Sequence, residues 1–189
     1  MNNPLPLLFR LTRRRNCHAA LRIVCALCLA SPAIAQKPPA NACAQPERGQ
    51  FDFWIGRWDV YPTGTTKLVA HSLIEKLYNG CAVRENWMPL GGTGGGSLSA
   101  WDPRDGKWHQ TWIDSSGATV MFQGGLAGDT MTIDGEWPNF VAPGKDGLVR
   151  MRYRRNPDGS VRQWGEVTQD AGKNWSAAFD FTYKPTPGS

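Results

Sequence analysis

Residues 51–61, FDFWIGRWDVY, have the aromatic composition expected at the start of a folded β domain. The stretch places two phenylalanines and two tryptophans around Gly56-Arg57-Trp58, directly after a polar segment rich in proline. Aromatic and β-branched residues are frequent in strands because they pack well on a pleated surface. We therefore expect the first strand of the domain to begin here, with an aromatic cluster at its entrance.

The sequence after Phe51 reads as a series of strands. No stretch shows the sustained 3.6-residue apolar periodicity of an amphipathic helix. Short runs rich in β-branched and aromatic residues recur instead, separated by turn signals such as Asn79-Gly80 and Asp158-Gly159. This pattern predicts an all-β domain of about nine or ten antiparallel strands in one meander. Closure into a single up-and-down β-barrel would remove the sheet edges, and a two-sheet sandwich is the alternative.

The first 35 residues resemble a cleavable secretory signal peptide. A basic stretch reaches Arg22, an apolar core follows at 23–30, and Ala33-Ile34-Ala35 provides a small-residue cleavage site. The apolar core is far shorter than the roughly 20 residues of a membrane span, and a retained anchor is the alternative. We expect cleavage after Ala35, an extended lead-in over 36–50, a β-barrel domain over 51–185, and a periplasmic or secreted location.

The charge of the remaining chain is balanced. The sequence has 21 Lys and Arg against 16 Asp and Glu, and the five excess positive charges all lie within residues 1–35. A protein that binds nucleic acid needs a basic face to neutralise phosphates. The balanced charge therefore gives no support for nucleic-acid binding. We expect a small-molecule ligand as the partner, no nucleic acid and no stable membrane span, and the oligomeric state stays open.

Two cysteines remain after removal of the predicted signal peptide, Cys43 and Cys81. An even pair in an oxidising compartment is most simply a disulfide. The alternative is a pair of free, buried thiols.

Several motifs together resemble a lipocalin-like, calycin-type family of uncharacterised exported bacterial proteins, a family of domains of unknown function. The motifs are FDFWIGRWDV, Ile74-Glu75-Lys76 with Asn79-Gly80-Cys81, Glu85-Asn86-Trp87, WDPRDGKWHQTWIDSSG and RQWGEVTQDAGKNW. The resemblance covers nearly all of the chain after the signal and implies a barrel similar to lipocalins and fatty-acid-binding proteins. It also implies that Trp54, Gly56 and Trp58 form the barrel floor, while it assigns no reaction.

Alternation along three strands suggests a ligand site inside the barrel. Side chains of a barrel strand point alternately into the lumen and outward, and an apolar cavity with a few fixed polar groups is typical of a small-molecule site. We expect the tryptophan-bearing strand faces to point inward and to bind a small, mainly apolar or aromatic ligand through eight residues: Glu85, Trp87, Trp108, Gln110, Trp112, Arg162, Trp164 and Glu166.

Other functions are less well supported by the sequence. A cofactor-free enzyme could use Glu85 and Glu166 as an acid–base pair if the two carboxyl groups met inside the barrel, and a filled core without a ligand is a further alternative. His109 is a candidate haem ligand, but no partner for its second ring nitrogen is visible in the sequence. No zinc motif occurs after residue 35. We therefore expect no cofactor and no metal, and assign no catalytic residue.

Overall fold

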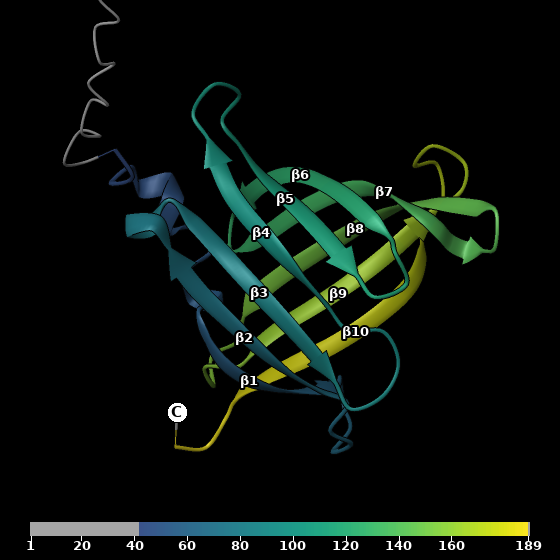
Figure 1. Cartoon of the computed structure of the whole chain (residues 1–189), viewed down its shortest axis with the longest axis horizontal. Helices are drawn as coiled ribbons and strands as arrows, with labels where there is room; N and C mark the ends of the chain where they lie inside the picture. Colours follow the sequence, from purple (N-terminus) through teal and green to yellow (C-terminus); the bar gives the residue numbers. More distant parts are fainter. Residues whose placement is uncertain (1–41, 189) are drawn as a thin grey trace, which may run out of the picture. The chain divides into compact units, whose positions relative to one another are not determined.

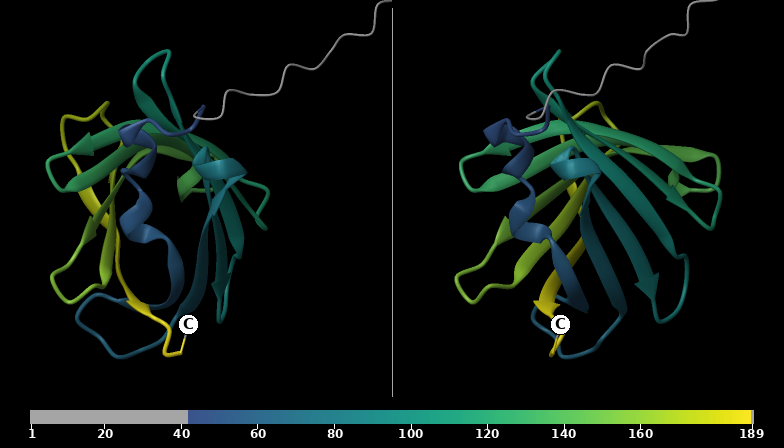
Figure 2. Two further views of the ribbon diagram at one scale, coloured as in Figure 1. Left: turned by 90° about the vertical axis from the view of Figure 1, so that its left-hand side faces the viewer. Right: turned by 60° about the vertical axis from the view of Figure 1, so that its left-hand side comes forward.

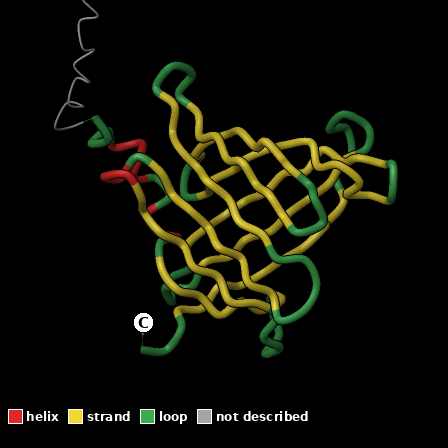
Figure 3. Tube along the Cα trace, in the orientation of Figure 1, coloured by secondary structure: helices red, strands yellow, loops and turns green. Residues whose placement is uncertain are grey.

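The computed structural model describes residues 42–188, so the predicted signal peptide lies outside the described residues. Ten antiparallel strands close into one barrel in the order β1-β10-β9-β8-β7-β6-β5-β4-β3-β2 (Figures 1 and 3). Each strand pairs with its neighbours in the chain, and β1 pairs with β10 to close the sheet. The prediction of a single up-and-down barrel is confirmed.

The strands are β1 (Gly56–Pro62), β2 (Ala70–Leu77), β3 (Ala82–Pro89), β4 (Gly95–Asp102), β5 (Lys107–Asp114), β6 (Thr119–Ala127), β7 (Thr130–Ala142), β8 (Lys145–Arg155), β9 (Val161–Thr168) and β10 (Ser176–Pro185). Three short 3-10 turns complete the elements: η1 (Pro46–Gly49), η2 (Asp52–Trp54) and η3 (Tyr78–Gly80). Within residues 42–188 there is no helix long and apolar enough to cross a membrane.

The meander gives the barrel two different ends. We call the end where β1 begins the floor end; it also carries the β2–β3, β4–β5, β6–β7 and β8–β9 turns. The opposite end, the mouth, carries the β1–β2, β3–β4, β5–β6, β7–β8 and β9–β10 connections. The segment leading into β1, drawn in blue in Figure 2, crosses the floor end.

An aromatic cluster, which we call the aromatic floor, fills the floor end. Edge-on contacts join Phe51 to Trp108 and to Tyr153, with ring centroids 5.0 and 5.3 Å apart. Aromatic rings prefer such tilted and edge-on arrangements to face-to-face stacking. All members are at most 5% exposed: Phe51, Trp54, Trp58, Trp108, Tyr153 and Tyr183. The aromatic residues of the opening stretch thus supply half of the buried plug.

The Gly56-Arg57-Trp58 motif has a local physical reason. The indole of Trp58 folds back over Gly56, so a Cβ at this position would lie 3.3 Å from the ring. Gly56 also has a φ of 151°, which other residues rarely adopt. The indole nitrogen of Trp58 donates a 2.9 Å hydrogen bond to the carbonyl of Trp54, which ties β1 to the turn before it.

A disulfide joins Cys43 to Cys81, as predicted, with their Cα atoms 5.0 Å apart. It links the chain before η1 to the β2–β3 turn at the floor end. The lead-in is not extended throughout, because Pro46–Gly49 forms the 3-10 turn η1. This turn lies next to the barrel, where Arg48 donates a 3.2 Å hydrogen bond to the carbonyl of Cys81.

Candidate functional site

A cavity of about 270 Å³ lies inside the barrel, between the aromatic floor and the mouth. Its walls come from strands on all sides of the barrel and from the β3–β4 connection. The residues that line it are Glu85, Trp87, Thr93, Gln110, Trp112, Asp114, Trp137, Phe140, Met151, Tyr153, Gln163, Phe179, Phe181 and Tyr183.

Glu85, on β3, is the one charged side chain among the buried residues of the described chain. Its two carboxyl oxygens accept long hydrogen bonds from the hydroxyls of Ser72 (3.3 Å) and Ser97 (3.4 Å) on the neighbouring strands. Burial raises the pKa of Glu85 from 4.5 to about 7, and the two hydroxyls offset only part of this effect. Near neutral pH, Glu85 can therefore exist in either protonation state.

Gln110, on β5, is a second buried polar group of the cavity wall and is 2% exposed. Its amide nitrogen donates a 3.0 Å hydrogen bond to the hydroxyl of Ser99. Its Oε1 atom is buried and accepts no hydrogen bond from the described residues. Because a buried polar atom without a partner is costly, this oxygen is available to a ligand that carries a donor.

The side of the cavity opposite β3 carries a hydrogen-bonded trio. The hydroxyl of Tyr183 donates to Oε1 of Gln163, and Nε2 of Gln163 donates to the hydroxyl of Tyr153 over 3.2 Å. Burial and the nearby carboxyl of Glu85 raise the pKa of both tyrosines well above 10. Both phenols therefore stay neutral in the range where Glu85 titrates.

The rest of the wall is mainly aromatic. Trp87 lies beside Phe181 and Tyr183, with ring centroids 5.8 and 6.3 Å apart. Towards the mouth, Trp112 and Phe140 flank Trp137 with centroids 6.1 and 5.2 Å from it. Flat aromatic surfaces surround the polar groups and suit a flat or apolar ligand body.

Asp114 is the second carboxyl group of the lining and lies at the end of β5 towards the mouth. Partial burial opposes its ionisation, but hydrogen bonds from Ser116, Trp112 and Ala118 outweigh this and lower its pKa. The cavity lining thus contains two carboxyl groups and no Lys, Arg or His.

The structure brings four of the eight predicted ligand-binding residues to the cavity. Glu85, Trp87, Gln110 and Trp112 all line it. Trp108 also points inward, but it belongs to the aromatic floor, where its indole nitrogen donates a 3.0 Å hydrogen bond to Gln50.

The prediction that Arg162, Trp164 and Glu166 face the lumen is wrong. These three side chains lie on the outer face of β9, while Val161, Gln163 and Gly165 take the buried positions between them. Arg162 pairs with Asp180 through contacts of 2.9 and 2.6 Å, and it also packs on the ring of Trp164. Charged groups are costly to bury, and on the outer face Arg162 and Asp180 can pair while they stay in contact with water.

The alternative in which Glu85 and Glu166 meet inside the barrel does not agree with the structure. Glu166 forms an ion pair with Arg152 on the outer face. The two carboxyl groups lie on opposite sides of the barrel wall, so they cannot act together on one ligand as acid and base.

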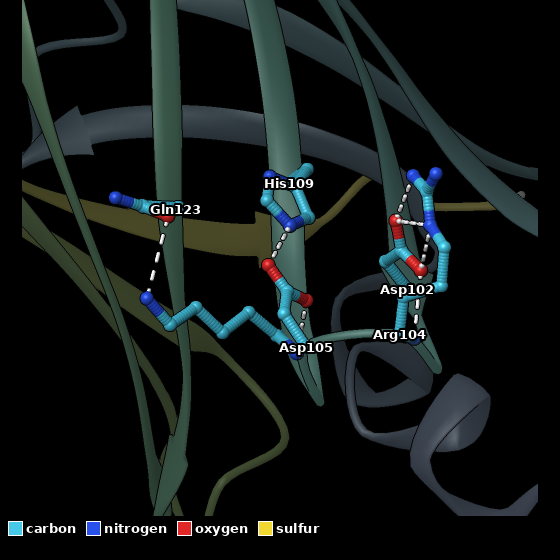
Figure 4. Close-up of polar contacts among 6 residues, drawn as sticks. Asp102, Arg104, Asp105, His109 and Gln123 are labelled. Carbon is cyan, nitrogen blue, oxygen red and sulfur yellow. Dashed lines mark hydrogen bonds and ion pairs between the residues drawn. The ribbon is translucent and has the colours of Figure 1, made fainter.

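His109 lies on the outer face of β5 and not in the cavity, so it cannot bind a haem there. Its Nε2 atom contacts Asp105 at 2.9 Å (Figure 4). Ligand atoms of Asp102, Asp105 and His109 lie within 4.8 Å of one another. However, Arg104 already engages both carboxylate oxygens of Asp102, and these ion pairs account for the arrangement without a metal ion.

The other ten of the fourteen lining residues were not predicted from the sequence. They include Gln163 on β9 and six aromatic residues: Trp137, Phe140, Tyr153, Phe179, Phe181 and Tyr183. A signal was present in FDFTY at 179–183, where apolar residues alternate with Asp180 and fix the inward face of β10.

The fold and this cavity define a closed antiparallel barrel with an internal site lined mainly by aromatic residues. A family model described as a protein of unknown function, DUF1579, matches residues 48–184, and the chain belongs to this family. Comparison with curated proteins gives no match.

Proposed function

We propose that this protein is an exported, lipocalin-like barrel that binds one small, mainly apolar or aromatic ligand in its interior. The observation that supports this most directly is the cavity of about 270 Å³, with its aromatic walls and few buried polar groups. Ligand sites typically combine a mostly apolar wall with a small number of placed polar groups. This volume lies just below the usual range of about 300–1,000 Å³ for ligand pockets, which favours a small ligand.

Export forms part of the proposal and rests on two observations. Residues 1–35 have the layout of a secretory signal, and the Cys43–Cys81 disulfide suits an oxidising compartment. The proposal therefore places ligand binding in the periplasm or outside the cell.

The proposed function is tested with a neutral hydrocarbon, ethylbenzene, titrated into the purified protein by calorimetry. We expect one equivalent to bind. Thr93→Trp, which adds a bulky ring to the cavity lining near the mouth, should weaken binding at least tenfold. Thr66→Trp, at an exposed position in the β1–β2 connection, is the matched control and should leave it unchanged.

Native mass spectrometry of gently purified protein provides an independent readout. A co-purified small molecule that is lost in Thr93→Trp would support the cavity as the binding site. Failure to bind ethylbenzene, together with the absence of any co-purified mass, would overturn the proposed function and favour a purely structural barrel.

A further inference from the structure

We propose that the ligand is a monovalent organic cation, an amine on a flat apolar body, whose ammonium group is held beside Glu85. This inference rests on the proposed function, because it requires that the cavity bind a ligand. It names the chemical class that the polar groups and the aromatic rings of the cavity would recognise together.

The charge of the cavity lining favours a cation. The lining holds Glu85 and Asp114 but no basic side chain. The arginines of the surrounding strands point outward and have partners there: Arg84 pairs with Glu75, Arg150 with Asp134 and Arg162 with Asp180. No cation of the described chain neutralises Glu85, so a positive charge can come only from a ligand or from a proton.

The balance of donors and acceptors in the cavity also favours a cation. Glu85 accepts only two long hydrogen bonds, from Ser72 and Ser97, and Oε1 of Gln110 accepts none from the described residues. The deep part of the cavity therefore has an excess of acceptors. An ammonium group carries up to three donors and no acceptor, which matches this excess.

An aromatic wall lies next to the carboxyl group of Glu85. Trp87 follows Glu85 by two residues on β3 and points to the same side of the sheet. It lies beside Phe181 and Tyr183. The faces of aromatic rings attract cations, tryptophan most strongly, and more so where water is excluded. Glu85 and these rings therefore provide complementary contacts for an ammonium group and the carbon atoms attached to it.

Other ligand charges fit less well. A carboxylate would meet Glu85 and Asp114 with no basic residue to balance it. A neutral hydrocarbon would fill the aromatic part but leave the acceptors of Glu85 and Gln110 unused. The groups that face Glu85 in the lumen are Tyr153 and Tyr183, which stay neutral, and Asp114 towards the mouth.

Binding of the cation has a proton balance that can be measured. Below neutral pH, the ammonium ion enters with its own proton and the carboxylic acid of Glu85 releases one, which leaves through the mouth to solvent. The complex then contains the ammonium–carboxylate pair. Affinity for the amine should therefore rise up to tenfold per pH unit from pH 5 to 7 and level off above it.

The experiment compares phenethylamine with ethylbenzene, which lacks only the amino group, and with phenylpropionate, which carries the opposite charge. Calorimetry at pH 8 should show at least tenfold tighter binding of phenethylamine than of either other probe. At pH 6, repetition in buffers of different ionisation enthalpy should reveal release of close to one proton. Ethylbenzene should bind without proton release.

Glu85→Gln should abolish the preference for phenethylamine and the proton release, while ethylbenzene still binds. Glu75→Gln, which removes an outward-facing carboxylate on β2, is the matched control and should change neither. If Glu85→Gln does not fold, the pH profile and the proton count of the unaltered protein still decide the question. Equal binding of phenethylamine and ethylbenzene would overturn the amine assignment and leave the proposed function intact. Binding of neither would overturn the proposed function itself.

Discussion

At the scale of single residues, Glu85 shows how burial and hydrogen bonding compete at one carboxyl group. Burial penalises the ionised form, and the hydroxyls of Ser72 and Ser97 stabilise it. Burial has the larger effect, which leaves the pKa near 7. The folded state therefore binds a proton that the unfolded chain, with its pKa of 4.5, has lost at the same pH.

This difference has a defined effect on stability. Because the pKa of Glu85 is raised on folding, its contribution is complete below pH 4.5 and is lost as pH rises through 7. The difference between the pKa values of the unfolded and the folded state, 4.5 and about 7, corresponds to about 3 kcal/mol of unfolding free energy. We expect denaturant unfolding to show this decline between pH 5 and 8 in the unaltered protein and not in Glu85→Gln. Glu75→Gln should retain it, and a decline of equal size in Glu85→Gln would assign it to other groups.

A second prediction at this scale concerns Gly165 on β9. A Cβ at Gly165 would lie 2.3 Å from the ring of Phe179, which lines the cavity. Gly165→Ala must therefore displace this ring, and we expect a loss of about 1–3 kcal/mol by thermal or denaturant unfolding. Gly125→Ala on β6 is the matched control, because open space surrounds that position. Equal stability of the two variants would contradict the close packing of Phe179 on β9.

At the scale of elements, the sequence predicted which side chains share a face better than it predicted which face is inward. For β5 the inward choice of Trp108, Gln110 and Trp112 agrees with the structure. For β9 the predicted inward face is wrong, because Trp164 lies on the outer face and packs on Arg162. The inward series of Val161, Gln163 and Gly165 is weakly apolar, so the strand alone does not reveal its orientation.

Neighbouring strands contain the missing information. On β8, Val149, Met151 and Tyr153 alternate with three arginines, which leaves no doubt about the inward face. Cross-strand pairs share a face, and Tyr153 lies opposite Gln163 in the β8–β9 register. That register is a long-range property, since a shift by one residue would reverse the assignment. The orientation of β9 therefore required the pairing and could not be derived from its own residues.

Trp58 points into the barrel and Trp164 points outward. Replacing each of them tests which strand faces are inward. Trp58→Ala removes a buried ring of the aromatic floor and should cost about 3–5 kcal/mol of unfolding free energy. Trp164→Ala removes a ring on the outer face that packs on Arg162, and should cost only about 1 kcal/mol. Denaturant unfolding of both variants measures the difference. A larger loss for Trp164→Ala would show that the inward and outward faces are exchanged.

At the scale of the whole molecule, the meander separates the closed floor end from the part of the barrel that holds the cavity. The strand number and the closure followed from repeated strand and turn signals in the sequence. The set of residues that line the cavity could not be predicted from these signals, because the cavity combines side chains from strands far apart in the chain, such as Glu85 on β3 and Gln163 on β9. Short-range patterns specify the strands, whereas the site depends on the register accumulated around the entire barrel.

The disulfide should stabilise the folded barrel without contacting the cavity. The Cys43–Cys81 bond spans 38 positions and joins the lead-in to the β2–β3 turn at the floor end. Closing a loop of that length restrains the unfolded chain by about 4 kcal/mol in the entropy model. The cavity lies on the other side of the aromatic floor and contains neither cysteine. Loss of the bond should therefore affect folding far more than ligand binding.

The double variant Cys43→Ser/Cys81→Ser separates these two effects. We expect its unfolding free energy to fall by up to about 4 kcal/mol, while its affinity for ethylbenzene at a temperature where it remains folded changes less than twofold.

Alkylation of the unaltered protein, denatured without reductant, should label neither cysteine. Quantitative labelling of both cysteines would show that the disulfide does not form. An unchanged stability of the double variant, with the bond intact in the parent, would contradict the expected restraint of the unfolded chain by the bond. A large loss of ethylbenzene affinity would show instead that the floor end helps to shape the cavity, because the aromatic floor would then move when the lead-in is released.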